Sequence, residues 1–399
     1  MRLPRPATPT PRRSLPVTFG WVSLLQDLGS KMVVPVLPLF LALELGASPL
    51  AVGLVEGLAG ISAAVAAAVG GRIASRRPAH WVRVGYGLSS IAKPALALAT
   101  TWPAVLAIRL GDRAGKGLRD GPRDLLLAAE GAGRRGRAFG VQQAMDKTGG
   151  FLGPLAGLAL FRLTGSFRAV FVVAFVPCVA SVLLLRNLVD PEPTMTSPRD
   201  DVALASDEPT STATEAERTE RRRHRQALVA VAAHSLGFAP VSLLLLRALD
   251  ARASATGVLL AFAGLRLVTA LASYPAGRAV DRLTPQLVSL IGMLVSAAAV
   301  ATVALATTPG RAAIGLAGVG LADALTKGPT KAWLASLAPA GRAGAVLGDR
   351  AAVTGGAGLV AGIAIGAAWG EDGTTALLVA AAVAAVAAAI AAATPRVSA

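Results

Sequence analysis

The stretch RLGDRAGKGLRDGPRD, residues 109–124, places eight charged side chains among sixteen residues of a chain that is 54% hydrophobic. Its glycines and Lys116 suggest a phosphate-binding loop, but their spacing excludes one. The Walker pattern requires four residues between its glycines and a Ser or Thr after the lysine. Here three residues separate Gly111 from Gly115, and Gly117 follows the lysine. The stretch is therefore either a hydrated loop or charge held inside an apolar element.

The spacing of these charges predicts one face of a helix. Positions i, i+3, i+4 and i+7 share a face of an α-helix, and four of the charges have this spacing: Arg109, Asp112, Arg113 and Lys116. Acids and bases on a helical face can pair with each other, exchange a proton or bind a charged solute. Which of these they do depends on whether the helix lies in water or in lipid.

The composition of the chain predicts an integral membrane protein. Charged residues make up 16% of 399 residues, against about a quarter in soluble proteins, and the mean hydropathy is +0.59. The net charge of +16 would also suit nucleic acid, but aromatic residues are only 4% and the basic residues cluster between apolar runs. We therefore expect a membrane and no nucleic acid as partner. The single cysteine, Cys178, excludes an intrachain disulfide.

Twelve apolar segments are long enough to cross a bilayer, which takes roughly 20 residues each. The first six lie near 17–44, 50–71, 81–101, 103–126, 137–162 and 167–186, and the second six near 227–248, 254–278, 285–307, 309–335, 343–369 and 374–393. Residues between the two sets are rich in Ser, Thr, Pro and charge, as linkers are. The predicted organisation is a tail at 1–16, a six-helix bundle at 17–186, a linker at 187–226, a second bundle at 227–393 and a tail at 394–399.

The positions of the arginines predict the orientation in the membrane. Loops on the cytoplasmic side carry an excess of Lys and Arg. The arginine clusters near 2–13, 72–77, 134–137 and 221–225 all fall on one side of the predicted spans. We therefore expect the linker and both termini on the cytoplasmic side of a bacterial cytoplasmic membrane.

The two halves of the chain repeat each other in register. GRIASRR at 71–77 is echoed by GRAVDRL at 277–283, and the TGG at 148–150 recurs at 354–356. Duplicated bundles with a site at their interface are how many secondary transporters are built.

Three residues of the second half resemble the loop signature of the major facilitator superfamily: Gly277, Asp281 and Arg282. The first-half copy has Gly71 but carries Ser75 where the acid belongs. RLGDRAGKGLRDGPRD followed by RRGRAFGVQQAMD also resembles a bacterial branch of that superfamily whose members generally lack an assigned substrate. The resemblance covers the whole chain. It implies an all-α fold of twelve transmembrane helices in two repeats. It also implies proton-coupled export of a small solute by alternating access, with a cytoplasmic gate at Gly277, Asp281 and Arg282.

Counting along the helices predicts a charge cluster inside the membrane. At about 1.5 Å per residue from Trp102, Asp112 and Arg113 lie roughly 15 Å into a core about 30 Å thick. The same depth on two other helices is reached by six polar residues: Asp27, Lys31, Gln142, Gln143, Asp146 and Lys147. Because charge at the bilayer centre costs at least about 2.5–3.5 kcal/mol per residue, we expect these groups to face one another around a wet cavity.

The cluster has two interpretations. It is either an ion-pair network that fixes three helices and does not touch substrate, or the lining of the transport path. The buried charges of the first half are Asp27, Glu56, Asp112 and Asp146 against Lys31, Lys93, Arg109, Arg113, Lys116 and Lys147. This surplus of positive charge favours an anionic substrate. Asp27 and Asp146 are the candidates for proton exchange.

Several other polar residues are predicted to have structural roles that do not involve the substrate. We expect 119–124 at the cytoplasmic surface and His234 as a hydrogen-bonded helix residue. Two ion pairs are expected near the cytoplasmic ends of spans: Asp349 with Arg350, and Asp323 with Lys327 at i, i+4.

The alternative function is an intramembrane enzyme that acts on a lipid headgroup. The chain contains no H-E-x-x-H, no G-x-S-x-G and no aspartate-rich metal motif, so we expect no enzyme, no metal and no cofactor. No ATP-binding motif occurs, so transport would depend on a gradient. The expected partners are a small-molecule substrate, the proton as coupling ion and membrane lipid, and the expected state is a monomer.

Overall fold

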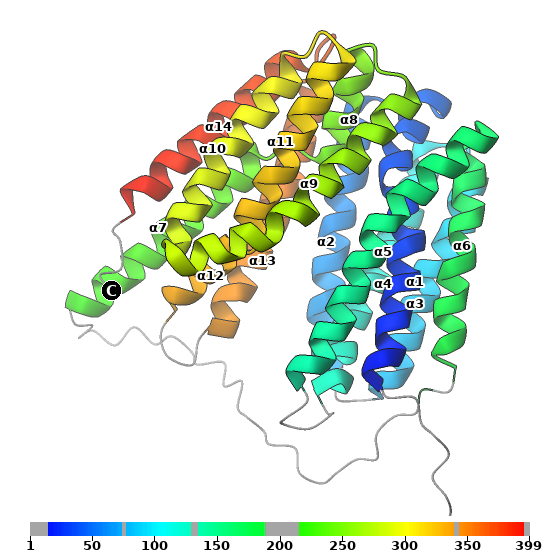
Figure 1. Cartoon of the computed structure of the whole chain (residues 1–399), viewed down its shortest axis with the longest axis horizontal. Helices are drawn as coiled ribbons and strands as arrows, with labels where there is room; N and C mark the ends of the chain where they lie inside the picture. Colours follow the sequence, from blue (N-terminus) through cyan, green and yellow to red (C-terminus); the bar gives the residue numbers. More distant parts are fainter. Residues whose placement is uncertain are drawn as a thin grey trace, which may run out of the picture.

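The computed structural model describes residues 15–73, 77–128, 135–186, 188, 215–338 and 343–394, and the regular structure in these ranges is helical (Figure 1). The first half comprises α1 (Leu15–Leu39), which continues into the π-helical turn η1 (Phe40–Glu44), then α2 (Pro49–Ile73), α3 (Pro78–Leu98), α4 (Trp102–Ala128), α5 (Arg135–Thr164) and α6 (Phe167–Leu184). The loops between them are short, so successive helices run in opposite directions.

Two membrane crossings of the second half are broken helices. The first is α7 (Glu215–Gly237) with α8 (Val241–Asp250), and the other is α11 (Pro309–Lys327) with α12 (Pro329–Ser336). Each break falls at a proline, Pro240 or Pro329, whose missing N–H cannot continue the backbone ladder. The remaining helices are α9 (Ala255–Arg282), α10 (Pro285–Ala304), α13 (Ala343–Ala367) and α14 (Thr374–Ala393).

Local sequence determines where several of these helices begin. The side chains of Ser254, Thr284 and Thr308 each accept a hydrogen bond from the backbone N–H three residues later, which caps α9, α10 and α11. Helix α7 begins at Glu215, inside the segment predicted as linker, because its Glu- and Arg-rich sequence favours helix and contains no breaker before the apolar span.

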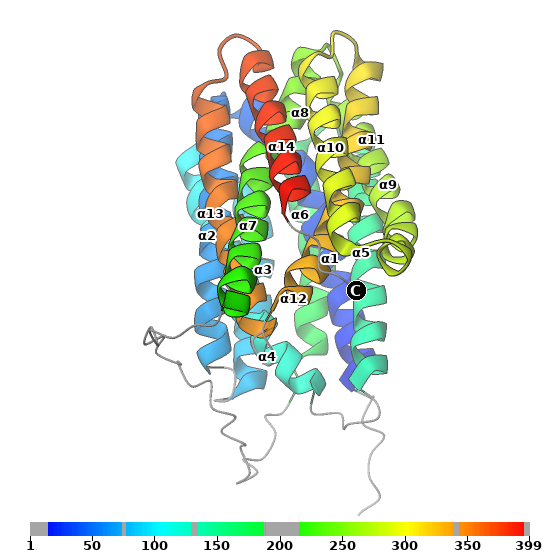
Figure 2. The same ribbon diagram turned by 90° about the vertical axis from the view of Figure 1, so that its left-hand side faces the viewer.

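Eight helices in the described ranges are long and apolar enough to cross a membrane by themselves. Helices α4 and α5 are not among them, although they run alongside the others in the same bundle (Figures 1 and 2). On α4, the charged side chains of Arg109, Asp112 and Arg119 are buried against neighbouring helices. With the broken helices counted once, the described chain makes twelve crossings, which confirms the predicted all-α fold of two six-helix repeats.

The helices form two bundles, and glycines allow close contacts within and between them. In the first bundle, α1 lies along α5, where a Cβ on Gly149 would stand 2.3 Å from the carbonyl oxygen of Leu24. Between the bundles, α2 packs against α13, and a Cβ on Gly53 would stand 2.1 Å from the carbonyl oxygen of Gly362. Any larger residue at these positions would separate the helices.

The bundles meet at one end and separate at the other (Figure 1). We call the end where α6 finishes and α7 begins the linker end, and the opposite one the short-loop end. One apolar core is shared by both halves; it includes Val36 and Val52 of the first and Leu243 and Ile365 of the second. Toward the linker end each bundle has its own separate core, around Tyr86 in the first half and around Trp333, Val231 and Met293 in the second.

Candidate functional site

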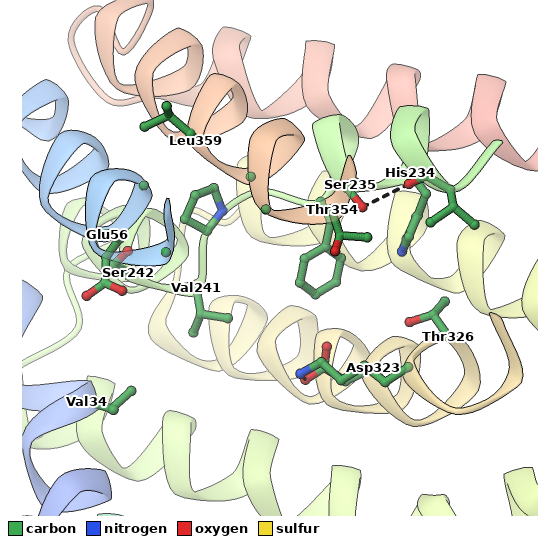
Figure 3. Close-up of a pocket in the computed structure, with 18 of the residues that line it drawn as sticks. Val34, Glu56, His234, Ser235, Val241, Ser242, Asp323, Thr326, Thr354 and Leu359 are labelled. Carbon is green, nitrogen blue, oxygen red and sulfur yellow. Dashed lines mark hydrogen bonds and ion pairs between the residues drawn. The ribbon is translucent and has the colours of Figure 1, made fainter. Parts of the chain in front are cut away.

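A cavity of about 530 Å³ lies between the two bundles. Residues of α1, α2 and α4 form one wall, and residues of α7, α8, α9, α11, α12 and α13 form the other. Figure 3 shows Val34 and Glu56 on the first wall facing Asp323 and Thr326 on the second. The shared core closes the cavity at the short-loop end. At the linker end Lys327 lines the cavity with 63% of its side chain exposed, so the cavity opens in that direction.

The charged residues that line this cavity are mostly cationic. They are Lys31, Arg113, Arg266, Lys327 and Arg350 against Glu56 and Asp323. Both carboxylates already have partners. Glu56 accepts a hydrogen bond from Arg109 at 3.3 Å, and Asp323 accepts one from Lys327 at 2.6 Å, which confirms the predicted i, i+4 pair.

Three arginines of the cavity have no carboxylate partner among the described residues. Arg113 comes from α4, Arg266 from α9 and Arg350 from α13. Arg266 lies 5.1 Å from the ring centroid of Phe262, and Arg350 donates a hydrogen bond of 3.3 Å to the hydroxyl of Thr330. Cations held among apolar helices without an ion-pair partner are costly. A bound anion would offset that cost from both walls.

A second set of charges lies inside the first bundle and reaches the central cavity only at Glu56. Asp112 accepts hydrogen bonds from Lys93 at 2.7 Å and from Arg109 at 2.9 Å, and Arg109 continues to Glu56. The side chains of Lys93, Arg109 and Asp112 are 2%, 3% and 9% exposed. Ser89 also donates to the backbone carbonyl of Asp112 at 2.9 Å. This network joins α2, α3 and α4.

The charged face of α4 is therefore divided. Arg109 and Asp112 belong to the buried network, while Arg113 reaches the central cavity. Lys116 lines two small pockets inside the first bundle instead. The predicted partners on α1, Asp27 and Lys31, lie next to this face. Oδ2 of Asp27 and Nζ of Lys31 are 4.0 Å apart. Lys31 lines both the central cavity and one of the small pockets.

The larger of these pockets measures about 140 Å³ and is strongly polar. Its lining includes Asp27, Lys116, Gln142, Gln143 and Asp146. Gln142 is buried and donates to the hydroxyl of Ser23 at 2.8 Å. Lys147 is exposed and lines none of the three cavities described above. The structure thus gathers most of the predicted residues into the first bundle and brings only Lys31 and Arg113 to the interface.

Arg119 is placed differently from the prediction. It is 4% exposed, and its guanidinium stands 4.0 Å from the ring centroid of Tyr86, rather than at a hydrated surface. Helix α4 continues to Ala128, so Arg119 still packs against α3. Gly85 leaves room for it, since a Cβ there would stand 2.6 Å from the Cβ of Arg119.

The second wall of the cavity was missed by the sequence analysis. His234 was expected to be a hydrogen-bonded helix residue; it lies in α7, and its buried Nδ1 has no hydrogen-bond partner in the described chain. Arg266 was not proposed as a site residue. Arg350 was expected to pair with Asp349, but its described side-chain hydrogen bond goes to Thr330 instead. A lone arginine within the apolar run of α9 is a signal that could have identified Arg266, because intramembrane charge is usually functional.

The residues of the predicted gate lie at the linker end of α9. Gly277, Asp281 and Arg282 are exposed there, and no ion pair joins Asp281 or Arg282 to another described residue. Ser75, the first-half counterpart of the acid, is outside the described residues.

Comparison with known proteins identifies the family. A family model described as Major Facilitator Superfamily matches residues 19–348. An uncharacterized MFS-type transporter of Methanocaldococcus jannaschii is 32% identical over 161 residues, which is 40% of this chain and 40% of the relative. The fold resembles that of the nucleoside transporter NupG, with a TM-score of 0.78 at 15% identity over 96% of this chain and 100% of that one. It also resembles an inward-facing, occupied bacterial homolog of the human lysosomal transporter Spinster, with a TM-score of 0.71 at 16% identity over 96% and 97% of the two chains. The twelve-crossing fold and the match over most of the chain together show that this protein belongs to the Major Facilitator Superfamily, a family of membrane transporters rather than enzymes.

Proposed function

We propose that the protein is a secondary transporter that moves a small organic anion across the membrane by alternating access. The observation that supports this is the set of cavity arginines without carboxylate partners, Arg113 on the first wall and Arg266 and Arg350 on the second. A cationic or neutral solute would give these arginines no ion-pair partner, whereas an anion between the walls would pair with them.

Placement of arginines on both walls suits a mechanism in which the bundles rock around a central site. An anion that binds both walls favours closure, because each wall gains a counter-charge only when the other is near. In the state that is closed at the linker end and open at the short-loop end, the gate proposed at Gly277, Asp281 and Arg282 would hold the linker ends together. Its residues have no described partner here, as expected for a state in which these ends are apart.

The orientation and the driving force belong to the same proposal. With the linker end cytoplasmic, as the arginine distribution predicts, the cavity opens to the cytoplasm of a bacterial cell and both termini are cytoplasmic. We further propose that a proton gradient drives transport through Asp27 or Asp146, which share the polar pocket of the first bundle. Asp27 approaches Lys31 to 4.0 Å, and Lys31 also lines the substrate cavity, so the two sites are neighbours.

Vesicle transport tests the substrate class without knowledge of the substrate. Proteoliposomes would be loaded with a mixture of small anionic, neutral and cationic solutes, and the solutes retained would be measured over time by mass spectrometry. We expect selective loss of one or more anions, faster under an imposed pH gradient. Reversing the gradient and the loading gives the direction, which the family resemblance predicts to be outward.

Matched variants show whether the central cavity carries the transported anion. Arg113→Gln should abolish anion loss. Arg278→Gln should not, because Arg278 is an exposed arginine on α9 that lies over Tyr274, away from the cavity. Selective movement of neutral or cationic solutes, or anion movement that survives Arg113→Gln, would refute the proposal.

A further inference from the structure

The polar pocket of about 140 Å³ inside the first bundle is separate from the central cavity, and we call it the bundle pocket. Residues of α1, α3, α4 and α5 line it, and none of them lines the central cavity. Its deepest residue on α1 is Asp27, which follows Leu15 by twelve positions and lies roughly 18 Å from the linker end of that helix. The bundle pocket therefore leads inward to the level of the predicted charge cluster.

The bundle pocket reaches the solution at the linker end. Its lining on α4 extends from Lys116 to Arg123, and this helix ends at Ala128 on the linker side. The side chain of Asp120 in this lining is 37% exposed, and Gln143 on α5 is exposed as well. A charged side chain is exposed to water rather than to lipid, because lipid contact is costly for it. Water at the linker end can thus enter the pocket.

The passage from Asp27 toward the central cavity is much smaller. A second pocket, which Asp27 also lines, measures about 20 Å³, and we call it the narrow pocket. A water molecule occupies about 30 Å³ in the liquid, so the bundle pocket has room for several waters and the narrow pocket for at most one. Only the bundle pocket can hold a continuous file of water.

Fixed positive charge stands between Asp27 and the central cavity. Lys31 and Arg113 line both the narrow pocket and the central cavity, so they separate the two spaces. Fixed cations in a narrow passage exclude protons. The bundle pocket, in contrast, has as many acidic as basic residues in its lining: Asp27, Asp120 and Asp146 against Lys116, Arg119 and Arg123.

We propose that, in the state open at the linker end, Asp27 is the carboxylate that exchanges protons, and that these protons pass through the bundle pocket and not through the central cavity. A hydronium ion in the pocket gives its proton to a carboxylate oxygen of Asp27 and leaves as water, and the reverse step returns the proton to water. The inference rests on the proton drive of the proposed function and assigns its route. A solute in the central cavity would leave this route open.

The surroundings of Asp27 distinguish it from Asp146, the other acid of the proposed drive. Asp146 lines the bundle pocket, whereas Asp27 lines both pockets, and its Oδ2 is 4.0 Å from Nζ of Lys31. Asp27 is therefore the acid in contact with the wall of the central cavity. The charged groups that face it are Lys31 on α1, Arg113, Lys116 and Arg119 on α4, Asp146 on α5 and Arg266 on α9.

Hydroxyl-radical footprinting of the purified protein in detergent tests whether the bundle pocket holds water. Radicals formed from bound water oxidise the side chains that the water touches. Tyr86 lines the bundle pocket although it is 1% exposed, whereas Phe171 is fully buried and lines none of the three cavities described. We expect oxidation of Tyr86 and none of Phe171. An unoxidised Tyr86 would show a dry pocket and would exclude the proposed route.

Two substitutions at Ser23 separate filling of the bundle pocket from loss of a hydrogen bond. Ser23 lines the pocket, and its hydroxyl accepts from Gln142 at 2.8 Å. Ser23→Leu loses this bond and fills the pocket, so Tyr86 should no longer be oxidised. Ser23→Ala loses the bond alone and should keep the oxidation. If Ser23→Leu fails to fold, Gln143→Phe on the exposed side of the pocket replaces it.

Gly60→Leu is the control that fills the central cavity instead. Gly60 lines that cavity, and no atom lies within 4 Å of a Cβ at this position. This variant should slow every movement of the solute through the central cavity. It should leave the oxidation of Tyr86 unchanged, because the bundle pocket is a separate space.

Vesicle assays with the solute that the protein is found to transport connect the bundle pocket to the proton drive. Net movement under a pH gradient requires proton exchange, whereas one-for-one exchange of labelled for unlabelled solute does not. Asp27→Asn and Ser23→Leu should therefore lose the acceleration by a pH gradient and retain solute exchange. Ser23→Ala should retain both.

The results distinguish this inference from the proposed function. Acceleration by a pH gradient that survives in a variant without Tyr86 oxidation would overturn the route, and acceleration that survives Asp27→Asn would overturn the choice of carboxylate. Either result leaves anion transport and its proton drive intact. No acceleration in the unsubstituted protein would refute the proton drive and this inference with it, while the selectivity for anions is decided by the solutes that the vesicles lose.

Discussion

Adjacent residues of α4 have different physical roles. Asp112 lies between two cations inside the first bundle, while Arg113 reaches the central cavity with no ion-pair partner among the described residues. The two interpretations of the charged stretch therefore apply to different parts of it. We propose that the network fixes the relative positions of α2, α3 and α4, and that Arg113 contacts the transported solute.

A pair of neighbouring substitutions tests this division. Asp112→Asn should lower the free energy of unfolding by about 3–5 kcal/mol, because the buried Lys93 loses its carboxylate partner. Arg113→Gln should lower it by less than about 1 kcal/mol, because no ion pair is broken. Chemical unfolding in detergent micelles measures both.

A double variant provides the control for the network. Lys93→Met combined with Asp112→Asn removes both charges and should recover most of the stability lost by Asp112→Asn alone, since an ion pair can be replaced by apolar packing. If Arg113→Gln destabilises the protein as much as Asp112→Asn does, the division of the α4 face is wrong.

At the scale of elements, the contact between α2 and α13 holds the short-loop ends together. The backbones meet at Gly53 and Gly362, and Gly57 packs on Leu359 one turn further along. Beyond these contacts, toward the linker end, Gly60 faces open space and lines the cavity. The glycines therefore determine how closely the bundles approach where the cavity is closed.

Gly53→Ala should shift the protein toward a state that is open at the short-loop end. The new Cβ would stand 2.1 Å from the carbonyl oxygen of Gly362, so the two helices must separate. Spin labels on cysteines at Ser48 and Glu371, both exposed at this end, should report longer distances by pulsed electron resonance. Cys178 is buried and does not compete for the label.

Gly60→Ala is the matched control on the same helix. No atom lies within 4 Å of a Cβ at this position, so the distance distribution should not change. Equal shifts from both variants would mean that the effect comes from helix propensity in α2 rather than from its contact with α13.

At the scale of the whole molecule, the two halves share a core at one end and have separate cores at the other. Hydrogen bonds and an ion pair also join the helices at the short-loop end. Arg247 donates to the carbonyls of Ala304 and Ala306 and lies 3.5 Å from Asp372. The backbone N–H and hydroxyl of Thr374 donate to Asp372 and hold the pKa of its carboxyl below the usual range. This carboxylate therefore stays charged, and its pairing with Arg247 is lost only at strongly acidic pH.

Single-cysteine labelling tests the orientation of the molecule. A cysteine at Asp372 should react with a membrane-impermeant reagent added to intact cells, because that loop lies at the short-loop end. A cysteine at Ala205, in the predicted linker, should react only after the membrane is permeabilised. Reaction of both in intact cells would contradict the twelve-crossing orientation in which the linker and termini are cytoplasmic.

The sequence by itself determined the class of fold. Span length, hydropathy and the repeated motifs are local properties, so the twelve crossings and the family signature at Gly277 and Asp281 could be predicted residue by residue. Counting along straight helices also predicted that Arg113 and Lys31 face a cavity, and both residues line the central cavity.

Only the tertiary structure decided which charges meet. One of the two partners of Asp112 is Lys93, on a helix that was not included in the predicted cluster. The rotation of α3 against α4, which brings them together, depends on packing at positions such as Gly85 and Gly115. Arg266 and Arg350 come from helices far apart in the chain and line the same cavity. Such proximity arises from the packing of whole helices and from the separation of the bundles at the linker end, and neither is a property of any local stretch of sequence.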